Sequence, residues 1–454
     1  MIIVFALLAL TVLVTANWYL WRRLFRDTTA GPGQTRRVGA AVIGGGWVLA
    51  IGALVAERTG APFWLQRVLA WPGFLWLALS IYLLLAVVAG EVVRPLLGRL
   101  LERRDRHREP PLTAVPHPER VPAGAPAEGR QETGSEALRP PQETRKAEAA
   151  SLDDPSTAPA PPGDSVTTPI AEPTRSNEPA PSRRLFVSRV VAGAAAAAAV
   201  GTVGYGTYGV LRGPRVKRVT VPLAKLPRAA QGYRIAVVSD IHLSPVLGRG
   251  FAQKVVDTIN STQPDLIAVV GDLVDGSVKD LGPAAAPLAQ LRARHGSYFV
   301  TGNHEYFSGA EQWVEEVRRL GLRPLENDRT ELPWFDLAGV NDIAGESEGQ
   351  GPDFARALGD RDTARACVLL AHQPVQIHDA VDHGVDLQLS GHTHGGQLWP
   401  GNLVAEAANP TVAGLERYGD TQLYVSRGAG AWGPPTRVGA PSDITVIELA
   451  SKQA

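Results

Sequence analysis

Four long apolar stretches without a charged side chain constrain this chain more than any other feature. They cover residues 1–21, 38–56, 68–90 and 190–211. A helix needs about 20 apolar residues to cross the hydrocarbon core of a bilayer, so each stretch predicts a membrane-spanning helix. Three of these helices would lie within residues 1–101 and the fourth within residues 182–212. Burial as core helices is the alternative, and it applies most to the Ala- and Gly-rich fourth stretch.

Arginines between the apolar stretches predict their orientation. Five follow the first stretch, two follow the second and six follow the third: Arg22, Arg23, Arg26, Arg36 and Arg37; Arg58 and Arg67; Arg94, Arg99, Arg103, Arg104, Arg106 and Arg108. Short loops rich in Lys and Arg stay in the cytoplasm. The alternation therefore places the first loop and the segment after the third stretch in the cytoplasm, and the N-terminus outside.

Residues 102–181 have the composition of a linker. Proline recurs throughout this segment, and no Phe, Trp or Tyr lies between Leu101 and Arg184. Such a segment cannot bury enough apolar surface to offset the entropy of the chain. We expect a disordered, Pro-rich and partly extended linker.

The linker is followed by SRRLFVSRVV, residues 182–191, directly before the fourth apolar stretch. The pair Arg183–Arg184 with Phe186 resembles a twin-arginine export signal, which is read by a receptor. It departs from the usual pattern by being internal, and no clear A-x-A cleavage site follows. The span is therefore expected to remain as an anchor; a plain cytoplasmic arginine cluster is the alternative. This crossing would place everything after residue 212 outside the cytoplasmic membrane, so that a multi-pass protein exposes its large domain on the extracytoplasmic side.

Residues 219–449 have the pattern of one α/β domain. Seven short β-rich runs lie at 234–240, 265–272, 297–303, 367–372, 386–392, 423–428 and 443–449. Helical patterns lie between some of them, at 251–262, 283–294 and 310–320. Strands that alternate with helices predict a layered α/β fold, in which ligand-binding loops follow the carboxyl ends of strands.

Composition excludes some functions for this domain. The chain has 45 Lys and Arg against 45 Asp and Glu, and this formal net charge of zero gives no electrostatic case for binding nucleic acid. Cys367 is the single cysteine, which excludes an intramolecular disulfide and a Cys-rich zinc site. It lies in an apolar run, so we expect it in the core.

Polar side chains follow five of the predicted strands. The runs are Asp240-Ile241-His242, Gly271-Asp272, Gly302-Asn303-His304-Glu305, His372, and Gly391-His392-Thr393-His394-Gly395-Gly396. In extended backbone, residues i and i+2 point the same way, so each D-x-H or H-x-H pair can address one point in space. Mixed imidazole and oxygen ligands suit Mn, Fe, Zn or Co better than Ca.

The motif series DIH, GDLVD, GNHE, His372 and GHTHGG resembles the calcineurin-like metallophosphoesterase superfamily. The runs GHTHGGQLWP and GAGAWGPPTRVGAPSDITVIEL are similar to its membrane-associated, twin-arginine-exported bacterial branch. The resemblance covers residues 219–449. It implies a four-layer α/β/β/α sandwich with a centre for two divalent metal ions, of which Mn, Fe and Zn are the expected identities.

Carried over residue by residue, the resemblance implies a role for eight side chains. Asp240, His242 and His394 would hold the first metal, and Asn303, His372 and His392 the second. Asp272 would bridge both metals, and His304 would contact the phosphoryl group or protonate the leaving oxygen. Two ions can clamp the attacking and leaving oxygens of an in-line displacement and turn a bridging water into hydroxide near neutral pH.

The expected function is membrane-anchored hydrolysis of phosphate-ester or pyrophosphate bonds. Within the enzyme class, a lipid-linked or nucleotide-sugar pyrophosphate competes with a soluble phosphodiester or phosphomonoester, because the motifs do not identify the leaving group. A non-catalytic membrane sensor or scaffold with a metal-binding domain is the alternative from another class.

Several residues near the motifs stay open. Asp275 and Glu305 could orient metal ligands or lie on exposed loops. Gln397 and Trp432 could touch substrate, although Trp432 could equally pack a loop, and Asp342 could lie near the site. For His295, His378 and His383 we expect surface positions or local hydrogen bonds.

Overall fold

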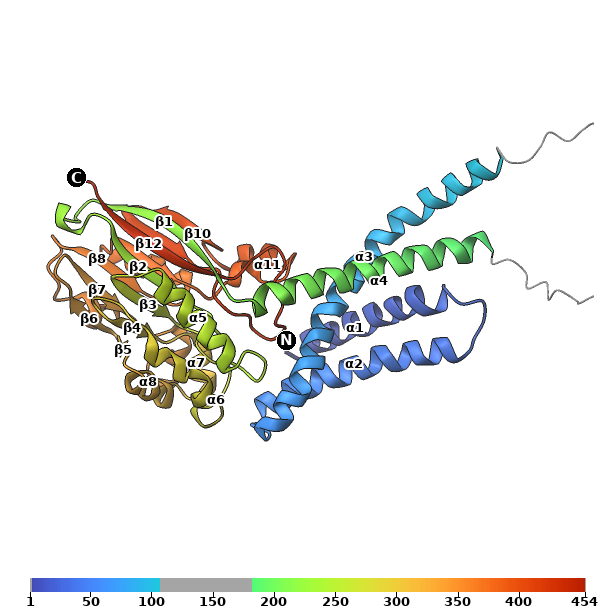
Figure 1. The fold of residues 1–454 in the computed structure, drawn as a ribbon, viewed down its shortest axis with the longest axis horizontal. Coiled ribbons are helices and arrows are strands. Elements are labelled where there is room, and N and C mark those ends of the chain that lie inside the picture. Colours follow the sequence, from blue (N-terminus) through green and yellow to red (C-terminus); the bar gives the residue numbers. More distant parts are fainter. Residues whose placement is uncertain (1, 107–181, 454) are drawn as a thin grey trace, which may run out of the picture. The chain divides into compact units, whose positions relative to one another are not determined.

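The computed structural model describes residues 2–106 and 182–453, so the predicted linker lies almost entirely outside the described residues. Figure 1 shows a domain of two β-sheets and their covering helices, together with the long N-terminal helices. The predicted domain start at residue 219 falls inside strand β1 (Arg215–Leu223), so the folded domain begins earlier than expected. The chain's C-terminal strand β12 (Asp443–Ser451) pairs in parallel with β1, which explains why β1 belongs to the domain.

The domain contains two six-stranded mixed sheets. The first sheet has the order β1, β12, β2 (Tyr233–Val238), β3 (Leu266–Val270), β4 (Ser297–Val300) and β5 (Arg323–Pro324). The second has the order β10 (Gly414–Tyr418), β11 (Thr421–Val425), β9 (Leu387–Ser390), β8 (Ala366–Leu370), β7 (Phe335–Gly339) and β6 (Asp328–Glu331). All seven predicted β-rich runs contain a strand, whereas β1, β5, β6, β7 and β10 were not predicted.

Alternating side chains show that the two sheets pack face to face. In β2, Ile235 and Val237 point into the core between the sheets, while Ala236 and Val238 point toward covering helices. This alternation arises because successive side chains of a strand point to opposite faces of the sheet. Both faces are apolar, which is why the run reads as continuously hydrophobic.

Helices cover the outer face of each sheet. The first sheet is covered by α5 (Arg249–Ser261), α6 (Val278–Ala285) and α8 (Ala310–Arg319). The second is covered by α9 (Phe354–Leu358) and α10 (Ile377–Asp382). This arrangement confirms the predicted four-layer α/β/β/α sandwich. One predicted helix was placed wrongly: residues 283–294 contain the end of α6 and then a 3₁₀ turn, since Pro283 and Pro287 interrupt regular α-helix.

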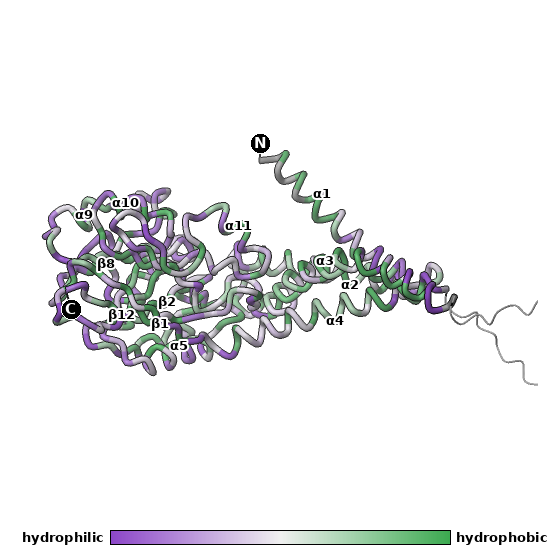
Figure 2. The backbone as a smooth tube through the Cα atoms, turned by 90° about the horizontal axis from the view of Figure 1, so that it is seen from above, coloured by the Kyte–Doolittle hydropathy of each residue, from purple (hydrophilic) through white to green (hydrophobic). Residues whose placement is uncertain are grey.

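Long apolar helices precede the domain. They are α1 (Ile2–Trp21), α2 (Gln34–Arg58), α3 (Phe63–Arg106) and α4 (Arg183–Leu211). Among the described residues, α2, α3 and α4 are long and apolar enough to cross a membrane, and Figure 2 shows their hydrophobic character. They contain the second, third and fourth predicted spans. The first predicted span is helical in α1, and its crossing of the membrane stays a prediction.

The predicted export motif forms the first turns of α4. Ser182 is the N-cap of this helix, and its side chain accepts a hydrogen bond from the backbone N–H of Leu185. Among the charged residues after α1, Arg23 pairs with Asp27 and Glu91 at 2.9 and 2.8 Å. Recognition of the motif as an export signal stays a prediction.

Candidate metal centre

The polar strand ends of both sheets meet at one place. Asp240 and His242 follow β2, Asp272 follows β3 and Asn303 follows β4. From the second sheet, His372 follows β8, and His392 and His394 follow β9. Because the carboxyl ends of neighbouring parallel strands lie at the same edge, residues up to 154 positions apart in the sequence become neighbours.

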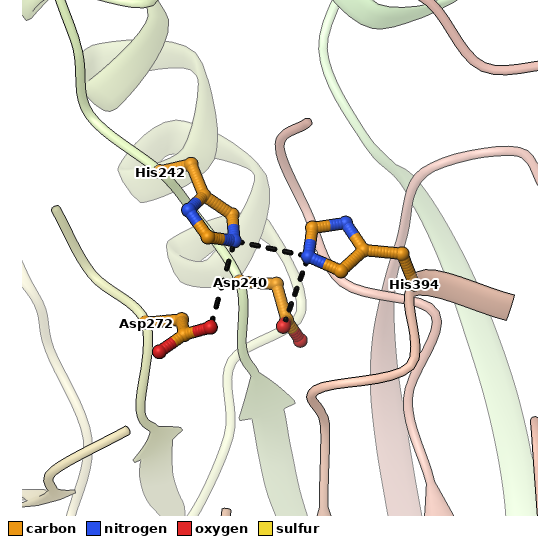
Figure 3. A group of neighbouring side chains, drawn as sticks. All are labelled: Asp240, His242, Asp272 and His394. Carbon is orange, nitrogen blue, oxygen red and sulfur yellow. Dashed lines mark hydrogen bonds and ion pairs between the residues drawn. The ribbon is translucent and has the colours of Figure 1, made fainter. Parts of the chain in front are cut away.

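Four of these side chains form a first cluster, shown in Figure 3: Asp240, His242, Asp272 and His394. Their ligand atoms all lie within 4.8 Å of one another. His394 Nε2 lies 3.0 Å from His242 Nε2 and 3.3 Å from Asp240 Oδ1. His242 Nε2 lies 3.7 Å from Asp272 Oδ2. The four groups therefore surround a common point.

A second cluster shares Asp272 with the first and adds His372 and His392. His372 Nε2 lies 3.2 Å from Asp272 Oδ2 but has no hydrogen-bond geometry to any partner. His392 Nδ1 lies 3.0 Å from Asn303 Oδ1. All seven predicted ligands are thus brought together, with Asp272 at the junction of the two clusters.

The donor set fits metal ions better than it fits a hydrogen-bond network. His372 Nε2 is buried and makes no hydrogen bond, although Asp272 Oδ2 lies 3.2 Å away, and a buried polar atom without a hydrogen bond is costly. The Nε2 atoms of His242 and His394 face each other. For a hydrogen bond between two neutral rings, only one of these atoms can carry a proton. Burial, followed by the neighbouring His372, lowers the pKa of His392 to about 4. Burial, followed by the proximity of His242 and Arg437, holds the pKa of His394 well below its usual value. Neutral imidazoles are the form that binds metals.

Backbone strain accumulates at the same residues. Five of the seven have positive φ angles between 46° and 72°: Asp240, His242, Asp272, His392 and His394. Each such residue costs on the order of 1–3 kcal/mol and persists only where the surroundings enforce it. Gly302 and Gly391 contribute to this enforcement, since a side chain at either position would collide with the carboxylate of Asp272 or Asp240.

Residues 233–396 match the family described as calcineurin-like phosphoesterase. An uncharacterized metallophosphoesterase of Aquifex aeolicus is 34% identical over 52% of this chain and 92% of its own length. The metallophosphoesterase YkuE of Bacillus subtilis is 30% identical over 60% of this chain and 98% of its own length. This chain belongs to the calcineurin-like metallophosphoesterase family.

A transmembrane protein with metallophosphoesterase domain from Danio rerio is also similar to this chain, with 40% identity over 55% of it. The match spans 60% of the Danio rerio protein. An uncharacterized metallophosphoesterase of Campylobacter jejuni is matched over 65% of its length. Family membership and the three apolar helices together support a membrane-associated member of this phosphoesterase family.

Asp275, left open from the sequence, orients two imidazoles of the phosphoesterase domain. Its Oδ1 accepts hydrogen bonds from His242 Nδ1 at 2.7 Å and from His304 Nδ1 at 2.8 Å. Protonation of His242 on Nδ1 leaves Nε2 with a free lone pair that faces the first cluster. His372 is held similarly, because its Nδ1 donates to the carbonyl of Val270 at 2.8 Å.

Glu305, also left open, is fully buried and supports the loop that carries Asp272. Its carboxylate accepts hydrogen bonds from the backbone N–H groups of Asp272, Leu273 and Gly302, at 3.0, 2.8 and 2.6 Å. Burial, followed by the neighbouring Asp272, raises the pKa of Glu305 to about 7. An exposed loop position is therefore wrong for both Asp275 and Glu305.

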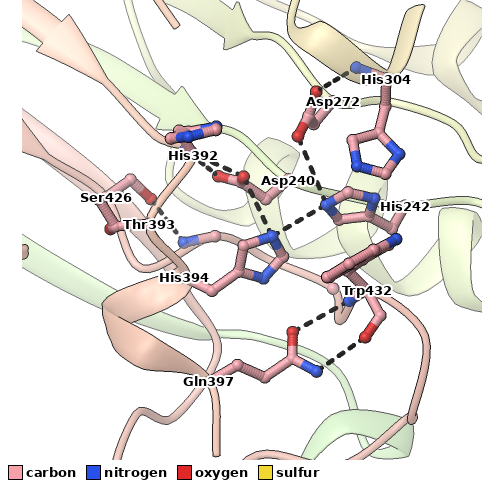
Figure 4. Close-up of polar contacts among 12 residues, drawn as sticks. Asp240, His242, Asp272, His304, His392, Thr393, His394, Gln397, Ser426 and Trp432 are labelled. Atoms are coloured by element: carbon pink, nitrogen blue, oxygen red, sulfur yellow. Dashed lines mark hydrogen bonds and ion pairs between the residues drawn. The ribbon is translucent and has the colours of Figure 1, made fainter. Parts of the chain in front are cut away.

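His304 lies beside the clusters, as Figure 4 shows, and the side of the site formed by His304, Phe307 and Trp432 is here named its entrance. Its ring is 5.5 Å from the Phe307 ring and 5.7 Å from the Trp432 ring, measured between centroids. Burial lowers the pKa of His304, but the hydrogen bond to Asp275 and the surrounding carboxylates outweigh burial and raise the pKa to about 9. Without bound metal ions, the imidazole therefore favours its protonated form near neutral pH.

Gln397 fixes the position of Trp432 at this entrance. Its side-chain Nε2 donates to the Trp432 carbonyl at 2.9 Å, and its Oε1 accepts from the Trp432 N–H at 3.0 Å. Gln397 thus supports the entrance, where the residue Trp432 is 53% exposed.

Arg437 is a site residue that the sequence did not reveal. It is buried and donates to the carbonyl oxygens of Gly430, His394 and Ala440, at 2.6, 3.0 and 3.2 Å. Its guanidinium also lies 3.1 Å from His394 Nδ1, which keeps the ring proton on Nε2. Metal binding through Nε2 requires this proton to leave or to move to Nδ1. The available signal was a lone arginine in the otherwise uncharged run at 428–441.

The remaining open residues lie outside the clusters. Asp342 is buried and accepts hydrogen bonds from Gln373 Nε2 and the Ala344 N–H, at 2.9 and 2.8 Å. His295 forms a local hydrogen bond with the Tyr233 hydroxyl at 2.7 Å. Cys367 is buried in β8, as expected for a core residue.

Proposed function

We propose that this chain is a membrane-anchored, two-metal phosphoesterase that hydrolyses phosphate-ester or pyrophosphate bonds. The observation that carries the proposal is the pair of overlapping clusters that share Asp272. Asp240, His242 and His394 would hold one ion, and Asn303, His372 and His392 the other. Asp272 Oδ2 lies 3.7 Å from His242 Nε2 and 3.2 Å from His372 Nε2, so this carboxylate would contribute to holding both ions.

Bound divalent ions would supply Lewis-acid activation of water and neutralise the charge on the phosphoryl oxygens. The side chains of the protein itself hold the reacting groups in position. Asp275 holds His304 at the entrance, where its protonated ring would bind a phosphoryl oxygen or give its proton to the leaving oxygen. Asp275 also holds His242, so one carboxylate aligns the proton donor with a metal ligand.

The orientation in the membrane is part of the proposal. The arginine pattern and the export-like motif at 182–191 favour a catalytic domain on the extracytoplasmic side of the cytoplasmic membrane. The metals that fit the mixed nitrogen and oxygen ligands are Mn, Fe and Zn.

The test is a substrate panel with the full chain purified in detergent and supplied with Mn, Fe or Zn. Aryl phosphodiesters, phosphomonoesters and pyrophosphates are included. We expect metal-dependent hydrolysis of at least one class, and its loss in Asp240→Asn. Asp257→Asn changes an exposed carboxylate on α5 and is the matched control, expected to keep wild-type activity. A wild-type protein that binds metal but hydrolyses nothing would instead favour the sensor or scaffold.

A further inference from the structure

A short helix beside the metal centre exposes an apolar surface. Helix α11 (Gly401–Ala408) begins seven positions after His394, and none of its residues is buried. Leu403 and Val404 are 60% and 73% exposed, and Trp399, just before the helix, is 52% exposed. A cluster of exposed large apolar side chains on a folded domain marks a surface that another phase or molecule covers.

The segment before α11 packs on the apolar helices rather than on the catalytic sheets. Leu398 lies against the cluster formed by α3 and α4, and the Tyr82 hydroxyl donates to the Trp399 carbonyl at 2.9 Å. Tyr82 is 19 residues from the start of α3, which corresponds to about 28 Å along a helix. Trp399 therefore contacts α3 well inside the apolar stretch 68–90 and not at the end of that stretch.

The metal centre itself lies beside the turn between α2 and α3. Val246, four residues after His242, packs on the cluster of Ala53 from α2 with Ala70 and Phe74 from α3. Glu57, in the last turn of α2, interacts electrostatically with Asp275 and His304. The side of the site that holds Asp275 and His304 therefore faces the end of α2, whereas Val246 and Trp399 contact the apolar part of α3.

Helix α4 adds an independent contact on the same side. The Thr207 hydroxyl is 2.7 Å from the Thr436 hydroxyl, and Gly206 lies against the backbone of Arg437. Arg437 in turn contacts His394. The loop of Thr436 and Arg437, which contacts the candidate ligand His394, is thus packed directly on α4.

From these contacts we infer that the substrate is a membrane lipid with a phosphate ester or pyrophosphate in its headgroup. The inference rests on the proposed function and adds its substrate class. The apolar chain of the lipid stays in the bilayer against Trp399, Leu403 and Val404, while the phosphoryl group enters between Phe307 and Trp432. Hydrolysis adds a water oxygen to phosphorus and breaks the bond to the leaving oxygen, which takes up a proton.

The test uses two substrates with the same scissile bond: hexadecyl p-nitrophenyl phosphate and methyl p-nitrophenyl phosphate. The full chain is reconstituted with Mn in phosphatidylcholine vesicles, and the ratio of the two kcat/KM values is measured for each variant. We expect the wild-type ratio to exceed about 10, since only the hexadecyl chain is long enough to bury apolar surface against α11.

Leu403→Glu/Val404→Glu separates contact with α11 from simple enrichment of the long-chain ester in the vesicle. We expect its ratio to fall toward one. Val375→Glu, at an exposed apolar position of the catalytic domain, is the control and should keep the wild-type ratio. Two results would overturn the inference and leave the proposed function standing. One is that the wild-type protein hydrolyses both esters at equal kcat/KM. The other is that the double variant keeps the wild-type ratio. Hydrolysis of neither ester overturns the inference, and the proposed function is then decided by the substrate panel.

Discussion

At the scale of single residues, the centre depends on side chains that hold other side chains in place. Asp275 accepts from His242 and His304, and Glu305 accepts three backbone N–H groups around Asp272. Each carboxylate is buried, so its hydrogen bonds are short and shielded from water. The geometry of the candidate ligands is therefore determined before any ion binds.

His304→Gln tests the role of the entrance histidine as a proton donor. Loss of a positioned acid costs on the order of 10²–10⁴ in rate when the leaving group needs a proton. We expect that loss with an alkyl ester and a much smaller loss with a p-nitrophenyl ester, whose leaving group departs as an anion. Comparing kcat for the two esters measures the difference. Equal losses for both esters would mean that His304 acts in another way.

Cys367 should be unreactive in the folded protein. It is buried in β8, and burial raises the pKa of its thiol to about 12, so the reactive thiolate is scarce at neutral pH. We expect no alkylation by iodoacetamide at pH 8 in native protein and full alkylation in urea, measured by mass spectrometry. Rapid native labelling would show that β8 opens or is exposed.

At the scale of helices and strands, α8 connects the outer layer to the loop of Asp275. Trp313 is fully buried there, and its indole N–H donates to the carbonyl of Gly276 at 2.8 Å. Trp313→Ala should destabilise the domain by about 3–5 kcal/mol, because a large cavity opens and the Gly276 carbonyl loses its donor. Thermal unfolding followed by circular dichroism measures this. Val375→Ala, at an exposed position, should leave the midpoint unchanged, and an equal midpoint for Trp313→Ala would contradict the packing described.

The sequence predicted the buried strands, and the polar residues that follow them, better than it predicted the strands at the edges of the sheets. Strands such as β2 and β3 are apolar on both faces and end in motif residues, so their runs stand out. Strands β5 and β6 were missed because they are short and carry charged residues such as Arg323 and Asp328. Arg437 was missed because its role comes from contacts across the fold, which no local spacing encodes.

At the scale of the whole molecule, one consequence of the proposed orientation can be measured directly. If α4 crosses from the cytoplasm outward, the C-terminus lies outside the cytoplasmic membrane. An epitope tag after Ala454 should be accessible to antibody on intact spheroplasts, whereas a cytoplasmic marker protein should be accessible only after permeabilisation. Labelling of the tag only after permeabilisation would reverse the orientation.

The metal content of the purified protein tests the central claim most directly. After reconstitution with Mn or Zn and removal of free metal, inductively coupled plasma mass spectrometry gives the number of ions per chain. Seven converging ligands with Asp272 at their junction predict two ions in the wild-type protein and fewer in Asp272→Ala. A wild-type protein that retains one ion or none would contradict the two-metal centre.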